Sequence, residues 1–580
     1  MRYNSCMDVV EELNSEQRAA ATAADGPVLI VAGPGTGKTK TLAARIAYLI
    51  ASGRAQPEQI LALTFTKKAA EEMRSRVSTL VDVAPVISTF HALCYEILGG
   101  QDLEFASEAA RLNIIKKLPK PASLKGFTTR ELALQISRAK NLAGADPELD
   151  KLTAAYDAVL NEQHLLDFDD LLTRTRDLLR ADAQTQKDLQ NRFTHILVDE
   201  FQDTNNLQYE LLQLMRGTAN LFVIGDPLQS IYGFRGASGS IFDRFRHDFP
   251  DALEVALTIN YRSVPGVVAL SNAVFATAPQ LVTHASNMQQ AGHVQTVQIF
   301  NEYAEADWVL RQIHKAIGGG DFLQAVSDDD SAEHRPLKDF AIVYRSRSAA
   351  QVMQRAIAES GLPYQVVGEG SPYEKPEVQA IIALLRAHIS DDAPAHEGFT
   401  ASEWRRLLDV LAQHDGSNPH ALAVKIIDML GLELTADLQQ FLNGLVRFSS
   451  VRSALQHLDA MSEQAFYDPA AEAVTLLTIH AAKGLEFPYV FLIAAEDGVL
   501  PHARSDIDEE RRLFYVAITR ARHNLDILHT ARRGGQQATM SRFAAALPEQ
   551  VLPRHTDPNL ADDRRRAQKR AIKRSQQRLF

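Results

Sequence analysis

Short apolar runs alternate along the chain with longer segments of helical pattern. The runs VLIVA, ILALTF, HILVDE and LFVIGD lie in the first half, and FAIVYR, AVTLLTIH and YVFLIAA lie in the second. They show little polar alternation, which is typical of strands that are covered on both faces of a parallel sheet. The pattern therefore predicts an α/β protein in which parallel sheets are flanked by helices.

The predicted strands form two groups, and each group is interrupted by a long helical stretch. At 580 residues the chain is also too long for a single hydrophobic core. We therefore expect two sheet domains, each with an inserted helical subdomain. The expected boundaries are 1–98 and 193–290 for the first domain, 99–192 for its insertion, 291–386 and 472–545 for the second domain, 387–471 for its insertion, and 546–580 for a basic, disordered tail.

Composition excludes several classes of protein. The net charge of −11 argues against a protein that coats nucleic acid indiscriminately, although a local DNA groove remains possible. Two cysteines cannot form a disulfide framework, a four-cysteine zinc site or an ordinary iron–sulfur site. Because no apolar run reaches the length of about 18 to 20 residues that a membrane span needs, and the start lacks a secretory pattern, we expect a cytoplasmic protein without a membrane partner.

The segment VLIVAGPGTGKT places a glycine-rich turn between a buried strand and a helix. Such a turn can simply begin a helix, but in a phosphate-binding loop the glycines let backbone amides approach the phosphates. Lys38 would then reach the β- and γ-phosphates of ATP, and the Thr39 hydroxyl would hold Mg²⁺. The predicted loop comprises Ala32, Gly33, Pro34, Gly35, Thr36, Gly37, Lys38 and Thr39, with Ala32 where the common pattern has glycine.

The segment HILVDEFQD is a second buried strand, and it ends in acidic residues. Alone it could be a strand followed by solvated acids, but beside a phosphate loop it supplies what phosphoryl transfer requires. Asp199 is a candidate for the Mg²⁺ shell, and Glu200 is a candidate for positioning or polarising the attacking water. Together the two segments predict a site for ATP hydrolysis at the strand ends of one sheet.

Further motifs occur in order across nearly the whole chain, and the series resembles the UvrD, Rep and PcrA group of superfamily 1 helicases. LNSEQRAA resembles the adenine-reading segment of that group, which implies a base contact for Gln17. In VIGDPLQSIYGFRGA, Gln229 stands where the group senses the γ-phosphate. The segments LTINYRSVPG, GLEFPYVFL and EERRLFYVAITRAR imply Tyr261 on adenine, Arg262 on the γ-phosphate, Glu486 on the ribose and Arg520 as a second arginine finger.

The resemblance assigns a second set of residues to single-stranded DNA. Aromatic side chains suit this role, because every base has a π-face on which they can stack regardless of sequence. Many relatives carry tryptophan where this chain has Phe234, so stacking there should be slightly weaker. The assigned residues are Phe65, Thr89, His91, Tyr232, Phe234, Arg235, His480 and Lys483.

The resemblance also implies an architecture and an activity. We expect two RecA-like motor domains with ATP and Mg²⁺ between them, and a monomer that moves 3′ to 5′ on single-stranded DNA and unwinds duplexes at single-strand/duplex junctions during repair, replication or recombination. Arginine fingers from a separate domain would stabilise transition-state charge only when the cleft closes, which would make closure ATP-dependent. The insertion 387–471 is shorter than in the large members, which suggests a reduced duplex-contacting arm and weak unwinding by the protein alone.

Two other functions and one docking site stay open. The chain could be a DNA-dependent ATPase that displaces bound proteins, or that acts as the motor subunit of a repair or anti-phage complex. It could also be an ATP-gated binding switch, although a sensor glutamine and two arginine fingers favour turnover. The basic tail could add only nonspecific phosphate attraction, but Gln576, Gln577, Arg578, Leu579 and Phe580 resemble the short peptide by which bacterial proteins dock on the replication sliding clamp.

Overall fold

The computed structural model divides the chain into two compact units, Met1–Phe300 with Leu485–Phe580 and Asn301–Gly484. Among the helices of the described residues, none combines the length and apolar character that a bilayer crossing requires. The structure describes residues 10–100, 103–106, 108–142, 146–231, 241–276, 284–290, 292–318, 335–367, 375–389, 399–412, 418–446, 448, 450–459 and 467–560.

The first unit contains a six-stranded parallel sheet of strand order β3-β2-β6-β7-β1-β8. The central strands are apolar on both faces, as expected for strands covered by helices on each side. The α/β fold class that the apolar runs predicted is therefore confirmed. The strands are β1 (Val28–Ala32), β2 (Ile60–Thr64), β3 (Val86–Thr89), β6 (His195–Val198), β7 (Asn220–Gly225) and β8 (Leu253–Leu257).

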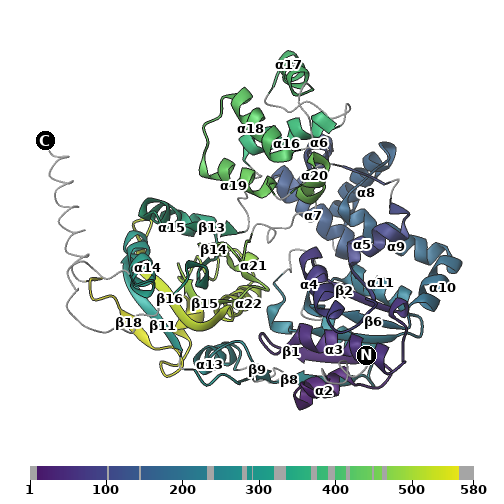
Figure 1. Ribbon diagram of the computed structural model, residues 1–580, viewed down its shortest axis with the longest axis horizontal. Helices are drawn as coiled ribbons and strands as arrows, with labels where there is room; N and C mark the ends of the chain where they lie inside the picture. Colours follow the sequence, from purple (N-terminus) through teal and green to yellow (C-terminus); the bar gives the residue numbers. More distant parts are fainter. Residues whose placement is uncertain are drawn as a thin grey trace. The chain divides into compact units, whose positions relative to one another are not determined.

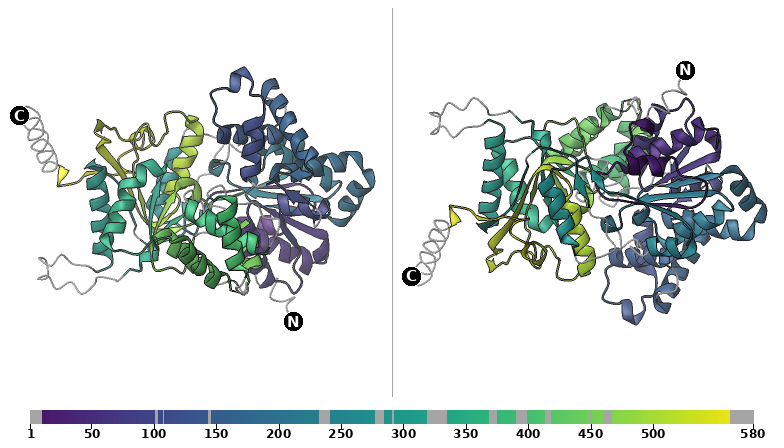
Figure 2. Two further views of the ribbon diagram at one scale, coloured as in Figure 1. Left: turned by 90° about the horizontal axis from the view of Figure 1, so that it is seen from above. Right: turned by 90° about the horizontal axis from the view of Figure 1, so that it is seen from below.

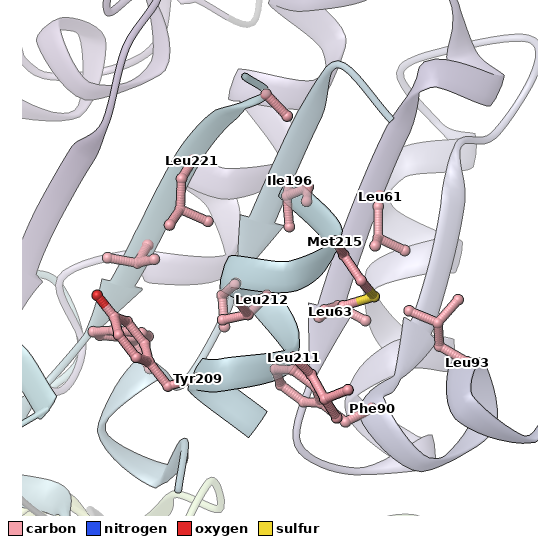
Figure 3. Close-up of a cluster of buried hydrophobic side chains, with 14 of the residues drawn as sticks. Leu61, Leu63, Phe90, Leu93, Ile196, Tyr209, Leu211, Leu212, Met215 and Leu221 are labelled. Carbon is pink, nitrogen blue, oxygen red and sulfur yellow. The ribbon is translucent and has the colours of Figure 1, made fainter. Parts of the chain in front are cut away.

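Helices cover both faces of this sheet (Figures 1 and 2). One face packs on α2 (Ser15–Ala21), α3 (Lys38–Ala51) and α4 (Lys67–Ser78). Figure 3 shows the core on the other face, where Leu61, Ile196 and Leu221 of the strands meet Leu212 and Met215. That face is covered by α5 (Phe90–Ile97), α9 (Phe168–Ala181), α11 (Asn206–Arg216) and α12 (Ile241–Asp248).

A helical insertion follows α5 and has a small core of its own. Ile115, Leu132, Ile136 and Tyr156 are fully buried in it. The neighbouring Lys140 is buried as well, so a charged network adjoins this apolar core. The elements between β3 and β6 are completed by β4 (Glu104–Phe105), α6 (Glu108–Lys117), α7 (Thr129–Leu142), α8 (Pro147–Glu162), β5 (Leu165–Leu166) and α10 (Ala183–Arg192).

The remaining elements of the first unit lie at the end of its first chain segment and in its second chain segment. β15 (Phe487–Leu492) pairs in parallel with β16 (Ala521–Arg533), and β11 (His293–Asn301) pairs in parallel with β18 (Arg554–Thr556). β9 (Ile259–Asn260) and β10 (Ala285–Ser286) form a short parallel pair close to β8 in sequence. The other elements are α13 (Pro265–Val274), α22 (Ile507–Ile518), β17 (Gln536–Gln537) and α23 (Arg542–Ala545).

The second unit combines a parallel sheet segment with a helical cluster. β14 (Val474–Thr478) pairs in parallel with β13 (Tyr364–Val367) on one side and with β12 (Phe340–Tyr344) on the other. The helical cluster has its own core, in which Ile381, Leu385 and Phe441 are fully buried. The helices of this unit are α14 (Glu302–Ala316), α15 (Arg347–Ser360), α16 (Pro376–Ile389), α17 (Ala401–Leu411), α18 (Pro419–Leu430), α19 (Ala436–Leu445), α20 (Val451–Asp459) and α21 (Ile479–Ala482).

Candidate active site

The glycine-rich turn links the end of β1 to the start of α3, as its sequence predicts. Gly35 has a φ of 71°, and a Cβ atom there would stand 2.5 Å from Cβ of Arg262. A Cβ atom at Gly33 would stand 2.2 Å from Nε2 of His284. These two positions therefore require glycine, one for its left-handed backbone and both for close approach of a neighbour.

Donors from outside the loop, or from its own side chains, bind its backbone carbonyls. In a phosphate-binding loop the amides must face the anion, so carbonyls that are tied elsewhere leave those amides available. Lys38, in the first turn of α3, also points back over the loop, with Nζ 3.2 Å from the carbonyls of Ala32 and Gly33. The other donors are the Thr36 hydroxyl to Gly33 (2.8 Å), the Asn260 amide to Pro34 (2.7 Å), the Tyr261 backbone N–H to Gly35 (2.8 Å) and the Gln17 amide to Thr36 (2.9 Å).

The acidic pair follows β6, the neighbour of β2 and β7 in the sheet. Asp199 is buried, and its backbone N–H donates to the Leu63 carbonyl at 2.9 Å. Burial and the adjacent Glu200 raise the pKa of Asp199 to about 7, against the opposing effect of Lys38. Two carboxyl groups that disfavour each other's charge are a suitable donor set for Mg²⁺, which prefers oxygen ligands.

Glu200 has a left-handed backbone, with a φ of 50° and a ψ of 44°. Non-glycine residues rarely adopt this conformation, and it recurs at functional sites where surrounding contacts hold it. Here the carboxylate of Glu200 accepts a hydrogen bond from the Gln202 side chain. The sharp turn therefore fixes the direction of the proposed catalytic carboxylate.

Buried polar side chains connect Glu200 to Gln229, the predicted γ-phosphate sensor. The Gln202 oxygen accepts the backbone N–H of Asp226 at 2.9 Å. The Asp226 carboxylate accepts the Gln229 side-chain amide at 2.7 Å and the Tyr515 hydroxyl at 3.5 Å. No role was predicted for Gln202, Asp226 or Tyr515 from the sequence, although all three lie inside the motif segments of the nucleotide site.

Arg520 reaches the same network. Its guanidinium is fully buried, and one terminal nitrogen lies 3.5 Å from the side-chain oxygen of Gln229. The Val516 and Leu485 carbonyls accept its other N–H groups at 2.9 and 3.1 Å. Burial, reinforced by the charge of Arg262, lowers the pKa of Arg520 to about 9. The structure thus brings Gln229 and Arg520 together, as their motif positions led us to expect.

The other nucleotide candidates contact one another or the phosphate loop. Arg262 forms an ion pair with Glu486, and Arg522 lies 3.8 Å from the same carboxylate. Tyr261 is 41% exposed, and its hydroxyl accepts a hydrogen bond from the Asn14 side chain at 2.8 Å. The side chain of Gln17 is buried, and its oxygen accepts the Asn14 backbone N–H at 3.3 Å. Asn14 therefore connects the two residues that we expect to face adenine.

The DNA candidates of the first unit occupy different environments. Phe65 directly follows β2 and is half-buried. Thr89 is buried and caps α5, because its hydroxyl accepts the Ala92 backbone N–H at 3.2 Å. His91 packs edge-on against Phe168, with ring centroids 6.4 Å apart and an interplanar angle of 68°.

Phe168 is an exposed aromatic residue that was not among the predicted DNA contacts. Its side chain is 59% exposed, yet it stacks on Phe105 with ring centroids 5.4 Å apart. The ring centroid of Tyr95 lies 6.3 Å from that of Phe105, and Tyr95 is 37% exposed. The available signal was an aromatic residue between acidic residues at a helix start, in LLDFDDLL.

His480 and Lys483 belong to the second unit, where His480 lies within the short helix α21 and Lys483 directly follows it. Thr478 caps this helix through a hydrogen bond from the Ala481 backbone N–H at 3.2 Å, and Lys483 at its end is buried. Other expected residues lie outside the part of the chain that the structure describes. These are Tyr232, Phe234 and Arg235 of the sensor motif and the five residues 576–580 of the tail.

Comparison with known proteins identifies the family. Residues 13–250 match the family model of the UvrD/REP helicase N-terminal domain, and residues 255–447 and 417–532 match that of the UvrD-like helicase C-terminal domain. The ATP-dependent DNA helicases PcrA of Staphylococcus epidermidis and Staphylococcus aureus are each 31% identical to the chain, over 94% of its length and 88% of theirs. The chain therefore belongs to the UvrD/Rep helicase family and is an ATP-dependent DNA helicase.

Proposed function

We propose that this helicase moves 3′ to 5′ along single-stranded DNA and uses ATP hydrolysis to separate duplexes at single-strand/duplex junctions. Family membership supports the direction and the substrate. The observation that carries the coupling is the buried path from Glu200 through Gln202 and Asp226 to Gln229 and Arg520. A change at the γ-phosphate that moved any member would be transmitted to the others, because buried polar groups do not tolerate lost partners.

The residues suggest a division of labour in hydrolysis. Amides of the phosphate loop and Lys38 would hold the triphosphate, while Glu200 would orient the attacking water. Thr39 and Asp199 would hold Mg²⁺, which would neutralise charge that develops on the phosphate oxygens. Gln229 would sense the γ-phosphate, and Arg262 and Arg520 would stabilise the transition state as arginine fingers. Gln17 and Tyr261 would face adenine, and Glu486, now paired with Arg262, would reach the ribose.

On the DNA side we propose a stacking surface formed by Phe65, His91 and Phe168. Phe168 is the most exposed of these aromatic rings, and exposed aromatic faces bind bases of any sequence. We retain the proposed DNA roles of Tyr232, Phe234 and Arg235, and of His480 and Lys483 in the second unit. Thr89 would act by holding the first turn of α5, which presents His91.

The test is ATPase activity with and without single-stranded DNA, followed by unwinding of tailed duplexes of both polarities. We expect DNA to stimulate hydrolysis, Lys38→Ala and Glu200→Gln to abolish it, and only the duplex with a 3′ tail to be unwound. Equal hydrolysis with and without DNA, together with an active Lys38→Ala variant, would refute the proposal. If only the duplex with a 5′ tail were unwound, the protein would move 5′ to 3′ and the proposed direction would be wrong.

A second function is favoured by the short helical insertion 387–471. In the second unit its described helices run from α17 to α20, and the larger relatives carry a longer segment there. We propose that the protein alone translocates and displaces bound proteins more effectively than it unwinds. Displacement of a DNA-bound protein, measured beside unwinding by the monomer, decides between the two, because robust solo unwinding contradicts this alternative.

The basic tail supports a separate proposal about a partner. Gln576, Leu579 and Phe580 would dock on the replication sliding clamp, with two apolar side chains filling a pocket at the end of a charged segment. Such docking would place the helicase in DNA replication or repair in the cytoplasm. A pull-down with the clamp, before and after removal of Leu579 and Phe580, tests this proposal; unchanged binding ends it.

A further inference from the structure

One buried amide connects the phosphate loop with the segment that carries Arg262. Asn260, the last residue of β9, is only 4% exposed. Its Nδ2 donates to the Pro34 carbonyl at 2.7 Å. Its Oδ1 accepts the backbone N–H groups of Arg262 at 2.8 Å and Ser263 at 2.9 Å. Both halves of the side chain are therefore engaged, one with the loop and one with the arginine segment.

The donor group of the Asn260 side chain, Nδ2, affects the direction in which the backbone amides of the phosphate loop point. In a trans peptide the carbonyl and the N–H point in opposite directions. A Pro34 carbonyl that is held outward by Asn260 therefore turns the Gly35 N–H to the opposite side, toward the inside of the loop. The Tyr261 backbone N–H holds the Gly35 carbonyl at 2.8 Å and does the same for the next amide, that of Thr36.

The acceptor atom of the Asn260 side chain, Oδ1, holds the backbone that carries Arg262. By binding two successive N–H groups, Oδ1 fixes the backbone at Arg262 in one conformation. The neighbouring Ser263 hydroxyl donates to the Ala521 carbonyl at 2.7 Å, immediately after Arg520. The contact is also tight, because a Cβ atom at Gly35 would lie 2.8 Å from Oδ1 of Asn260. The phosphate amides and the backbones of both arginines are thus connected through this one side chain and its neighbour.

We propose that Asn260 is a positioning residue for ATP hydrolysis. It holds the phosphate-binding amides of the loop and the backbone of Arg262 in a fixed arrangement relative to each other. The inference rests on the proposed role of Arg262 and adds a residue that acts through it. Loss of the donor half should mainly weaken triphosphate binding. Loss of the acceptor half should mainly slow turnover, because a misplaced charge stabilises the transition state poorly.

Two variants separate these effects. Asn260→Asp keeps the acceptor and removes the donor, so we expect the KM for ATP to rise at least tenfold and kcat to fall less. Asn260→Ala removes both, so we expect kcat to fall about 10- to 100-fold as well, the loss typical of a displacement of about 1 Å in an active site. In the Arg262→Ala background, Asn260→Ala should lower kcat no more than about twofold, since residues that act together are not additive.

Asn220→Ala is the matched control. Asn220 also joins two backbone segments through its amide, accepting the Gly26 N–H at 2.7 Å and donating to the Thr194 carbonyl at 3.4 Å, but it lies at the start of β7. Its kinetic constants should match the wild type. The inference is overturned if Asn260→Ala has the same kcat and KM as Asn220→Ala, or if neither Asn260 variant folds, which would make the residue merely structural. An active Lys38→Ala variant would instead refute the proposed function itself.

Discussion

The guanidinium of Arg520 lies 3.5 Å from the side-chain oxygen of Gln229. These residues are 291 positions apart, yet both are fully or nearly fully buried in the same unit. Because Gln229 is also bound to Asp226, a change in its side chain cannot occur without a change at Arg520 or Asp226. The pair therefore joins the residue that we propose as the phosphate sensor to the residue that we propose as an arginine finger.

Replacement of Arg520 tests this link. We expect Arg520→Ala to lower kcat for DNA-stimulated ATP hydrolysis by about 10³-fold, the low end of the effect of an arginine finger. Arg520→Lys should recover little, because lysine lacks the planar fork that binds two partners at once. Steady-state ATPase kinetics, with kcat calculated per folded molecule of each variant, measures both effects. Arg180→Ala, which removes an exposed ion pair with Glu210, is the control, and a loss below tenfold in Arg520→Ala would contradict the assignment.

Removal of the exposed ring of Phe168 tests the DNA surface. We expect Phe168→Ala to weaken single-stranded DNA binding by about 1 to 3 kcal/mol, the range for loss of one base-stacking side chain. ATP hydrolysis without DNA should be unchanged, because Phe168 lies outside the nucleotide network. Fluorescence anisotropy with a labelled oligonucleotide gives the affinity. Phe127→Ala is the comparison, since Phe127 is 37% exposed and lies outside the Phe168 cluster; equal affinities for the two variants would argue against a stacking surface at Phe168.

The residue types of the nucleotide site were easier to predict from the sequence than the hydrogen bonds that join its distant segments. Strands, the phosphate loop and the acidic pair follow from local periodicity and residue type, so the fold class was predicted correctly and residues such as Lys38 and Asp199 could be proposed directly. The hydrogen bond from Asn260 to Pro34 joins positions 226 residues apart, and no local pattern encodes it. Phe168 was missed for a related reason, since its exposure follows from the packing of α5 against α9 and not from its neighbours in sequence.

Acidification should destabilise the first unit through His195. Burial, reinforced by Arg45 and Arg54 and opposed by Asp25, lowers the pKa of His195 in the folded state. The unfolded chain, with a histidine pKa of about 6.5, therefore binds the proton more strongly than the folded chain. The contribution of His195 to the free energy of unfolding is fully present above that pH and is lost as the pH falls toward the lower pKa of the folded state. Melting temperatures measured from pH 8 to pH 5 should show a smaller decline for His195→Asn than for the wild type. The exposed His555→Asn should leave the decline unchanged, and an identical slope in all three proteins would exclude His195 as a contributor.

Lys140 provides the clearest test of a buried charge in the helical insertion. Its Nζ lies 2.7 Å from Asp157, 3.0 Å from Asp167 and 2.7 Å from Asp170. Although burial alone would lower the pKa of Lys140, the three carboxylates raise it, so the ammonium stays charged at neutral pH. Lys140→Met keeps the volume but leaves the carboxylates facing one another, and we expect it to lower the free energy of unfolding by about 3 to 5 kcal/mol.

A second variant distinguishes charge repulsion from loss of packing as the cause of the lower stability of Lys140→Met. If repulsion among the carboxylates left without Lys140 causes the loss, Asp170→Asn should restore part of the stability in the Lys140→Met background, because it removes one of the repelling charges. Chemical denaturation of the single and double variants gives the coupling. The exposed Lys187→Met serves as the control and should change stability by less than about 0.5 kcal/mol. A double variant less stable than Lys140→Met would show that the network stabilises through its hydrogen bonds and not through charge balance.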